Sequence, residues 1–293
     1  MSGWISQFNS SLKSIEVEEV FDLIIYRPLA FLFVKIIYRT NLTPNQLTFA
    51  SMIFGIWAGV AISFNTRTAF YIAALSILLY DVLDCSDGQL ARLKHNGTHL
   101  GRILDGFADY IVSIAVYIGI GIGFASNSES PAFWWTMTAL AGVSNAVQSG
   151  LLDYYRTKYL DHKLNRVSIL EEELQQFKLE YEQLKKVQGR SIEKFIINIY
   201  LNYSLIQNKI ISANKNSSTS KNFDREDYVK KNKKFIHFWT YLGPTTQWTF
   251  LIVTCLIGRI DIYLFGLIIV GNILAVILFT VQYMIDKNTL AAK

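Results

Sequence analysis

Long apolar stretches without a charged residue constrain the fold of this chain more than any other feature. Three of them are long enough to cross a bilayer as a helix: residues 47–64, 131–152 and 262–285. Three further apolar blocks supply other spans: residues 69–80, 110–125 and 235–258. The first two are long enough only if their helices continue into the polar segment that lies between them. We therefore predict an all-α membrane protein with six transmembrane helices.

Most basic residues fall on one side of the membrane if the N-terminus is cytoplasmic. Four segments then lie on that side: residues 1–44, 81–109, 154–234 and 286–293. They contain 26 of the 28 Lys and Arg residues, as expected for cytoplasmic loops. Both termini are therefore expected in the cytoplasm. The net charge of +5 indicates attraction to anionic lipid headgroups and not to nucleic acid.

The segment before the first span is expected to lie along the membrane surface. Residues 15–39 contain an apolar run that Pro28 interrupts and that Arg27, Lys35 and Arg39 flank. Charges this close together favour an interfacial helix over a spanning one. The first span is predicted to begin directly after it, with Thr43 as N-cap and Pro44 in the first turn.

The chain is predicted to divide into four parts. They are an interfacial segment (1–44), helices 1 to 4 with the aspartate-rich segment (45–153), a cytosolic helical insertion (154–234) and helices 5 and 6 with the C-terminal tail (235–293). In the insertion, apolar residues recur every three or four positions over 167–184 and again over 192–210. This pattern favours a helical hairpin or coiled coil, and its apolar stripe could be buried within the chain or between two copies.

Residues 81–109 contain five aspartates between two apolar helices. Read as a helix, one face of the first half carries Asp84, Asp87, Gly88 and Ala91. One face of the second half carries Gly101, Asp105 and Asp109. The turn-prone sequence KHNGTH joins the two halves. We therefore expect the two helices to direct four carboxylates into one volume.

Four charges buried together at the edge of a bilayer would cost many kcal/mol without compensation. A cation among them provides it, and an all-oxygen ligand set suits Mg²⁺ or Mn²⁺, which commonly accompany phosphate. Gly88 and Ala91 leave room beside the helix, and Arg92 could contact a phosphate oxygen. The segment is therefore interpreted as a site for a metal-bound diphosphate.

Other readings of the aspartates fit less well. A calcium-binding EF-hand loop needs ligands at alternate positions, whereas the spacing here is three residues and helical. An ion-coupled transporter would not need the groove at Gly88 and Ala91, and a solvated loop would not keep a two-helix register. Metal-dependent prenyl transferases also use paired aspartate motifs, but they have more spans and an Asn where this chain has Tyr80.

The segment resembles the signature D-x2-D-G-x2-A-R-x8-G-x3-D-x3-D of the CDP-alcohol phosphotransferases, also called CDP-alcohol phosphatidyltransferases. All eight fixed positions match: Asp84, Asp87, Gly88, Ala91, Arg92, Gly101, Asp105 and Asp109. The run LTPNQLT at residues 42–48 is also similar to the entry of that family's first helix. The resemblance implies a six-helix membrane domain, usually homodimeric, that works on CDP-linked substrates.

By motif position, the resemblance assigns roles to these residues. The four aspartates at 84, 87, 105 and 109 would hold one or two Mg²⁺ or Mn²⁺ ions on the diphosphate of the donor. Asp109 would also act as general base on the acceptor hydroxyl. The nucleotide would be bound by Gly88, Ala91 and Arg92, to which we add Asn45 and Gly101.

Outside the signature, assignments are less direct. Asn145, Gln148 and Arg156 could form a pocket for the acceptor, although Asn145 and Gln148 could equally hydrogen-bond between helices. Asp81, one turn before Asp84, is read as a supporting or solvated group in preference to a metal ligand.

We therefore expect a multi-pass enzyme of phospholipid synthesis in a bacterial or archaeal cytoplasmic membrane, with a cytosolic active site. It would transfer a phosphatidyl group from CDP-diacylglycerol to an alcohol and release CMP. Inositol phosphate, glycerol phosphate and serine remain candidate acceptors, and Arg156 and Lys158 favour a polyol phosphate. Two alternatives stay open: a CDP-choline or CDP-ethanolamine enzyme with a lipid acceptor, and a catalytically silent scaffold.

Overall fold

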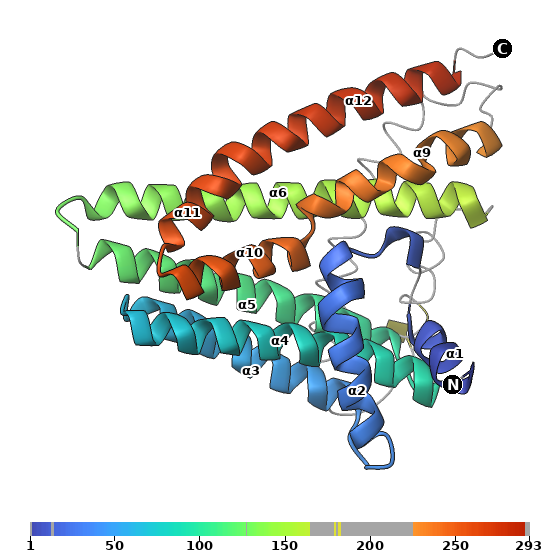
Figure 1. The fold of residues 1–293 in the computed structure, drawn as a ribbon, viewed down its shortest axis with the longest axis horizontal. Coiled ribbons are helices and arrows are strands. Elements are labelled where there is room, and N and C mark those ends of the chain that lie inside the picture. The colour runs from blue at the N-terminus through green and yellow to red at the C-terminus, as the bar shows by residue number, and fades with distance from the viewer. Residues whose placement is uncertain are drawn as a thin grey trace.

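The computed structural model describes residues 2–12, 15–126, 128–164, 179, 181–182 and 225–290, and all regular secondary structure in these ranges is helical (Figure 1). The N-terminal helices are α1 (Ser2–Ser11), α2 (Arg27–Ile37), α3 (Pro44–Ser63), α4 (Arg67–Lys94), α5 (His99–Ala125) and α6 (Pro131–Leu164). The C-terminal helices are α9 (Arg225–Trp239), α10 (Pro244–Ile257), α11 (Ile260–Phe265) and α12 (Asn272–Leu290). Short 3-10 or π-helical segments complete the chain: η1 (Ile15–Val17), η2 (Asp22–Tyr26), η3 (Thr240–Leu242) and η4 (Gly266–Gly271).

Four helical stretches within the described residues are long and apolar enough to cross a membrane: Pro44–Ser63, Arg67–Lys94, Gly101–Ala125 and Ile260–Lys287. Each overlaps a predicted span, and α4 and α5 continue through the aspartate-rich segment as predicted. The helix α6 has 34 residues but is not among the four, and α10 is a shorter apolar helix of 14 residues. By length and composition, four of the six predicted spans are therefore supported.

The predicted span at 235–258 is wrong as a single helix. The helix α9 ends at Trp239, the short turn η3 follows, and α10 begins only at Pro244. Gly243 before it has an extended backbone, with φ −76° and ψ 159°. Proline has no N–H to donate to a preceding turn but fits the first turn of a new helix, so the chain stops and restarts here.

The helices α3, α4 and α5 all begin at a threonine that caps their first turn. Thr43 and Gln46 form a reciprocal capping box, which confirms the predicted start of the first span. The Thr66 hydroxyl accepts a hydrogen bond from the N–H of Ala69, and that of Thr98 accepts one from Gly101. The chain reverses between α4 and α5, so the two halves of the signature lie on antiparallel helices (Figure 1).

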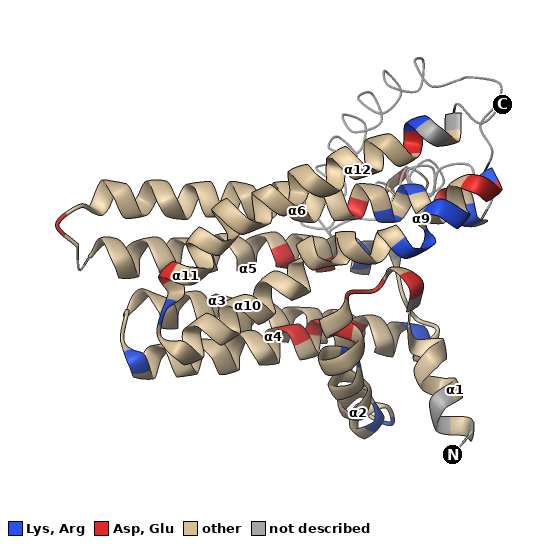
Figure 2. Cartoon of the chain, turned by 45° about the horizontal axis from the view of Figure 1, so that its top comes forward, with Lys and Arg blue, Asp and Glu red and all other residues tan. Residues whose placement is uncertain are grey.

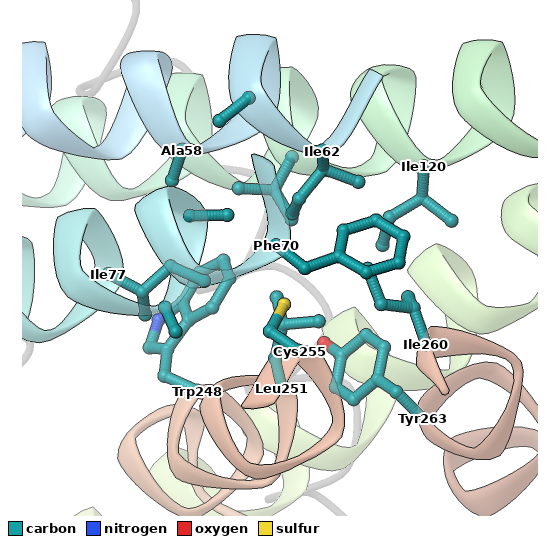
Figure 3. Packing of buried hydrophobic residues seen from close by; sticks show 14 of the residues in the cluster. Ala58, Ile62, Phe70, Ile77, Ile120, Trp248, Leu251, Cys255, Ile260 and Tyr263 are labelled. Carbon is teal, nitrogen blue, oxygen red and sulfur yellow. The ribbon is translucent and has the colours of Figure 1, made fainter. Parts of the chain in front are cut away.

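The core is built where α3, α4 and α5 meet α10 and α11. Figure 3 shows part of it, with residues from these helices packed side by side: Ala58, Ile62, Phe70, Ile77, Ile120, Trp248, Leu251 and Tyr263. The helices α3 and α5 approach through glycine, because a Cβ added to Gly119 would lie 2.0 Å from the carbonyl oxygen of Gly59. Such backbone contact is typical of packing between membrane helices, where small residues let the helices touch.

The N-terminal segment packs onto the bundle through both apolar and polar contacts. Pro28 lies in the first turn of α2 and does not break it, and the α2 residues Ala30, Phe31 and Val34 are fully buried. The Glu19 carboxylate accepts the N–H of Thr246 at 2.8 Å, which caps the start of α10. The segment is thus attached to a helix more than 200 residues further along the chain. Its predicted position at the membrane surface stays a prediction.

Charged residues gather toward one end of the helices. Figure 2 shows most of the Lys, Arg, Asp and Glu residues on the side where the two termini lie, while the opposite ends of α3 to α6 carry few. At that sparse end, Arg259 pairs with Asp261 at 2.7 Å. The apolar stripes predicted over 167–184 and 192–210 lie almost entirely outside the described residues.

We predict that Gly119→Ala destabilises the protein by about 1–3 kcal/mol, since the added methyl group meets the backbone of α3, which cannot rotate away. Gly106→Ala in the same helix is the matched control, because nothing lies within 4 Å of its added Cβ. The midpoint of thermal unfolding in detergent measures both. Equal midpoints for the two variants would contradict the close contact between α3 and α5.

A second prediction concerns pH. Burial raises the pKa of Glu19 from 4.5 to about 7, with the nearby Asp22 adding to the effect. The folded state therefore keeps a proton that the unfolded state releases, so this contribution to stability is full below pH 4.5 and is lost as the pH rises to 7. It amounts to roughly 3 kcal/mol.

The variant Glu19→Gln cannot titrate, so its stability should fall less than that of the wild type between pH 5 and pH 7, a range that lies within the window from 4.5 to about 7. Thermal unfolding across this range measures the difference. Parallel curves would show that Glu19 does not hold the extra proton.

Candidate active site

Three aspartates from two helices meet at one point. Asp84 and Asp87 project from α4 and Asp105 from α5, and one oxygen atom from each lies within 4.8 Å of the others. Asp87 is buried, and the other two are partly buried. Their meeting follows from the helical spacing of three residues within α4 and from the turn that places α5 antiparallel to it.

The fourth signature aspartate is held differently. Asp109 is not one of the three clustered carboxylates. Its Oδ1 accepts a hydrogen bond of 2.6 Å from the hydroxyl of Tyr80, which is buried on α4 one turn before Asp84. The expectation that four carboxylates share one volume is thus met by three of them, and the roles assigned to Asp109 stay predictions.

A cavity of about 700 Å³ opens beside the clustered aspartates. Seven of the eight signature residues line it: Asp84, Asp87, Gly88, Ala91, Arg92, Gly101 and Asp105. Asn45, expected to bind the nucleotide, and Arg156, expected to bind the acceptor, line the same cavity. Asp109 is absent from this lining.

Arginines line the cavity from four helices, among them Arg102 on α5. Arg27 on α2, Arg92 on α4 and Arg156 on α6 all line it, and each has a buried guanidinium nitrogen without a hydrogen-bond partner. An unsatisfied buried donor costs free energy, which an anionic ligand would recover. The cavity therefore combines clustered carboxylates with guanidinium groups, an arrangement suited to a ligand that carries both phosphate and a cation.

The carboxylate cluster fits a divalent cation. The Oδ1 atom of Asp84 is buried and accepts no hydrogen bond, which leaves it available as a ligand. The hydroxyl of Thr48 donates to Oδ2 of Asp87 and so fixes the orientation of that carboxylate. Carboxylate oxygens are hard ligands of the type that Mg²⁺ and Mn²⁺ prefer.

Two residues assigned to the acceptor lie elsewhere. The amide of Asn145 donates to the side chain of Gln247, and Gln247 in turn donates to Gln148 at 3.0 Å. Gln148 also donates to Asn272 at 2.9 Å, so the network links α6, α10 and α12. Neither Asn145 nor Gln148 lines the cavity, and the structure favours the helix-to-helix reading that the sequence left open.

Asp81 lies at the cavity, although it is outside the signature. It is 5% exposed, and its Oδ2 has no hydrogen-bond partner. It is not one of the three clustered carboxylates. Its position one turn before Asp84 is compatible with a supporting role, and the choice between that role and ligation stays open.

The N-terminal segment forms a wall of the cavity that sequence reasoning missed. Val17, Glu18, Asp22 and Arg27 all line it. Arg27 donates to Glu18 at 3.0 Å, and burial raises the pKa of Asp22 while the charge of Arg27 opposes that rise. The acidic residues directly before the apolar run were a signal, because a purely interfacial helix would not need them.

Comparisons with known proteins agree with this geometry. Residues 41–167 match the family model described as CDP-alcohol phosphatidyltransferase. The chain carries a CDP-alcohol phosphatidyltransferase domain. This domain begins just before α3 and ends just after α6, so it contains the clustered aspartates and most of the cavity lining. The resemblance predicted from the signature is thereby confirmed for residues 41–167.

Three curated relatives share parts of the chain. A phosphatidylinositol phosphate synthase of Corynebacterium glutamicum is 34% identical over 108 residues, which cover 37% of this chain and 47% of that protein. A phosphatidylinositol phosphate synthase of Mycobacteroides abscessus is 29% identical over 125 residues, which cover 41% of this chain and 51% of that protein. Cholinephosphotransferase 1 of Danio rerio is 28% identical over 100 residues, which cover 30% of this chain and 26% of that protein. The matched region thus spans about half or less of each relative.

The geometry of the CDP-alcohol phosphatidyltransferase domain predicts the effect of removing one ligand. Asp84→Asn should weaken Mn²⁺ binding by about tenfold or more, because an amide replaces a charged oxygen ligand that has no hydrogen bond to lose. The affinity is measured by titrating the protein with Mn²⁺ and following the free ion by electron paramagnetic resonance. Asp261→Asn, at the opposite end of the helices, is the matched control. Equal affinity in both variants would rule out Asp84 as a ligand.

Proposed function

We propose that this chain is a divalent-metal-dependent membrane transferase of phospholipid synthesis. It moves a phosphatidyl group from CDP-diacylglycerol to the hydroxyl of a polar alcohol and releases CMP. The observation that carries this proposal is the placement of Asp84, Asp87 and Asp105 within 4.8 Å of one another at a cavity that also presents guanidinium groups. The CDP-alcohol phosphatidyltransferase domain at residues 41–167 supports it.

The donor is proposed to lie along α4 with its diphosphate at the aspartates. Gly88 and Ala91 leave space beside the helix, and Arg92 supplies a buried Nη2 with no partner. Asn45 and Gly101 complete the nucleotide-binding part of the lining. When bound by the three clustered aspartates, Mg²⁺ or Mn²⁺ would neutralise charge on the diphosphate and on the departing CMP.

Asp109 is proposed as the general base. The acceptor oxygen attacks the phosphorus distal to cytidine, the bond between this phosphorus and the oxygen of CMP breaks, and the acceptor proton passes to the Asp109 carboxylate. Asp109 lies one helical turn beyond Asp105, although it does not line the cavity. Contacts to a catalytic base often form fully only once the substrate is bound, so this position is compatible with the role.

A phosphorylated polyol is the proposed acceptor. Arg156 lines the cavity with a buried Nε that has no hydrogen-bond partner, so this nitrogen is available to an acceptor phosphate. Two of the relatives are named phosphatidylinositol phosphate synthases. The resemblance to cholinephosphotransferase 1 favours a second candidate, in which CDP-choline or CDP-ethanolamine is the donor and a lipid is the acceptor.

The remaining proposals concern the setting of the enzyme. The distribution of Lys and Arg supports a cytoplasmic position for both termini and for the cavity. The four apolar helices support a multi-pass protein. Two of the relatives are bacterial, which supports a bacterial or archaeal cytoplasmic membrane. The homodimer is proposed from the sequence signature alone. A catalytically silent scaffold is the alternative to an enzyme.

Release of CMP by the purified protein separates these possibilities. With Mn²⁺ present, CDP-diacylglycerol and inositol phosphate should give CMP and a new phospholipid, whereas serine in place of inositol phosphate should give neither. Activity with CDP-choline and diacylglycerol would favour the second candidate function. Absence of CMP from every CDP-linked donor, with folded protein, would support the scaffold.

We predict that Asp109→Asn lowers kcat by about 100-fold or more, since an amide cannot accept the acceptor proton. Affinity for the CDP-linked donor should change little, because Asp109 does not line the cavity. Steady-state rates and calorimetric binding of the donor measure the two quantities. Asp153→Asn, exposed on α6, is the control. A loss of donor binding as large as the loss of rate would make Asp109 a binding group.

A further inference from the structure

Tyr80 is buried next to the proposed active site and has no assigned role. It lies on α4 four positions before Asp84 and is 3% exposed. Its hydroxyl donates to Oδ1 of Asp109 at 2.6 Å, across 29 positions of sequence. Neither residue lines the cavity. This hydrogen bond therefore joins α4 to α5 through two residues that are not part of the cavity lining.

The ring of Tyr80 is held in place by a third helix. It meets the ring of Trp248 on α10 edge to face, with centroids 5.8 Å apart and an interplanar angle of 83°. Both rings belong to the core cluster that contains Ile77 and Leu251. Figure 3 labels Trp248 in this cluster, together with Ile77 and Leu251. A ring packed on several sides cannot change its rotamer freely, so the hydroxyl position is fixed by the core.

The position of Asp109 follows from this contact. The helical spacing of four residues places Asp105 and Asp109 on the same face of α5, yet only Asp105 belongs to the carboxylate cluster. Tyr80 occupies Oδ1 of Asp109, and an O–H donor to a carboxylate forms one of the stronger hydrogen bonds in proteins. Asp109 is thereby oriented toward Tyr80. Its charge still acts on Asp84, but it is not one of the three carboxylates whose oxygens lie within 4.8 Å of one another.

We propose that Tyr80 is a positioning residue that reserves Asp109 for proton transfer and keeps it from binding the metal. The phenol holds Oδ1 and leaves Oδ2 for the acceptor hydroxyl, so that three aspartates bind the cation and the fourth takes the proton. This inference rests on the proposed function for its catalytic part. The separation of Asp109 from the metal site can be measured without turnover.

A plain structural role for the phenol is the competing explanation, because a buried tyrosine hydroxyl needs an acceptor wherever it lies. Tyr263 provides the matched control. It is fully buried in the same core cluster, and its hydroxyl shares a hydrogen bond of 3.0 Å with Tyr117. Removing either hydroxyl takes away hydrogen bonding in the core, but only Tyr80→Phe releases Asp109.

The experiment compares wild type, Tyr80→Phe, Tyr263→Phe and the double variant Tyr80→Phe with Asp109→Asn in detergent. Titration with Mn²⁺ alone, followed by electron paramagnetic resonance, should show several-fold tighter binding in Tyr80→Phe, since the freed carboxylate becomes an additional ligand. The double variant should return to the affinity of the wild type. Tyr263→Phe should bind Mn²⁺ as the wild type does.

The steady-state rate of CMP release gives the second measurement. In Tyr80→Phe, kcat for CMP release should fall by about tenfold or more while KM for the CDP-linked donor stays within about twofold, as expected when only the base is misplaced. Tyr263→Phe should keep both values. Unchanged Mn²⁺ affinity in Tyr80→Phe, or an equal loss of kcat in Tyr263→Phe, overturns the inference. Absence of CMP from the wild type would instead refute the proposed function, and the Mn²⁺ titration would still decide the role of Tyr80.

Discussion

Mutual repulsion among buried carboxylates is the constraint around which this structure is arranged. Two ionised groups 4.8 Å apart repel by roughly 3 kcal/mol at an effective dielectric constant of about 20, and Asp84, Asp87 and Asp105 form three such pairs. That total exceeds what any single hydrogen bond contributes. The arrangement therefore needs packing that holds the helices together and a ligand that compensates the charge. Backbone contact between Gly59 and Gly119 helps to supply the first, and the cavity has room for the second.

Hydroxyl groups then divide the aspartates into two kinds. Thr48 on α3 donates to Asp87, which lines the cavity, whereas Tyr80 on α4 donates to Asp109, which does not. Both donors come from helices whose positions the core fixes, so the orientation of each carboxylate depends on tertiary packing. Under the proposed function, three aspartates of this motif bind the cation and the fourth takes the proton.

The N-terminal segment closes the site from a different part of the chain. Glu19 caps α10, and Arg27 pairs with Glu18 at the cavity wall. A Cβ at Gly243 would lie 2.1 Å from the Glu19 carboxylate, so the capped helix must begin after a glycine. The break between α9 and α10, which divides a predicted span, is also the place where this segment is attached. The extended backbone at Gly243 thus leaves room for the Glu19 carboxylate that caps α10.

Much of the fold could be predicted because its signals are local. Thr43 and Pro44 mark a helix start by side-chain chemistry alone, and the apolar length of α3 or α12 predicts a span without reference to any neighbour. The prediction of a single span at residues 235–258 was wrong for the same reason, namely that it used only a local signal. The apolar composition of this segment was read as one helix, although Gly243 and Pro244 favour a stop and a new start.

The sequence by itself determined which residues share a helix face, because a spacing of three or four positions acts within one helix. It thereby placed Asp84, Asp87, Gly88 and Ala91 together and indicated the family. Only the tertiary structure decided that Asp109 turns to Tyr80, that Asn145 and Gln148 link helices, and that Arg27 reaches the cavity. These contacts join residues 29 to 124 positions apart or residues on separate helices, and their geometry depends on how whole helices pack against one another.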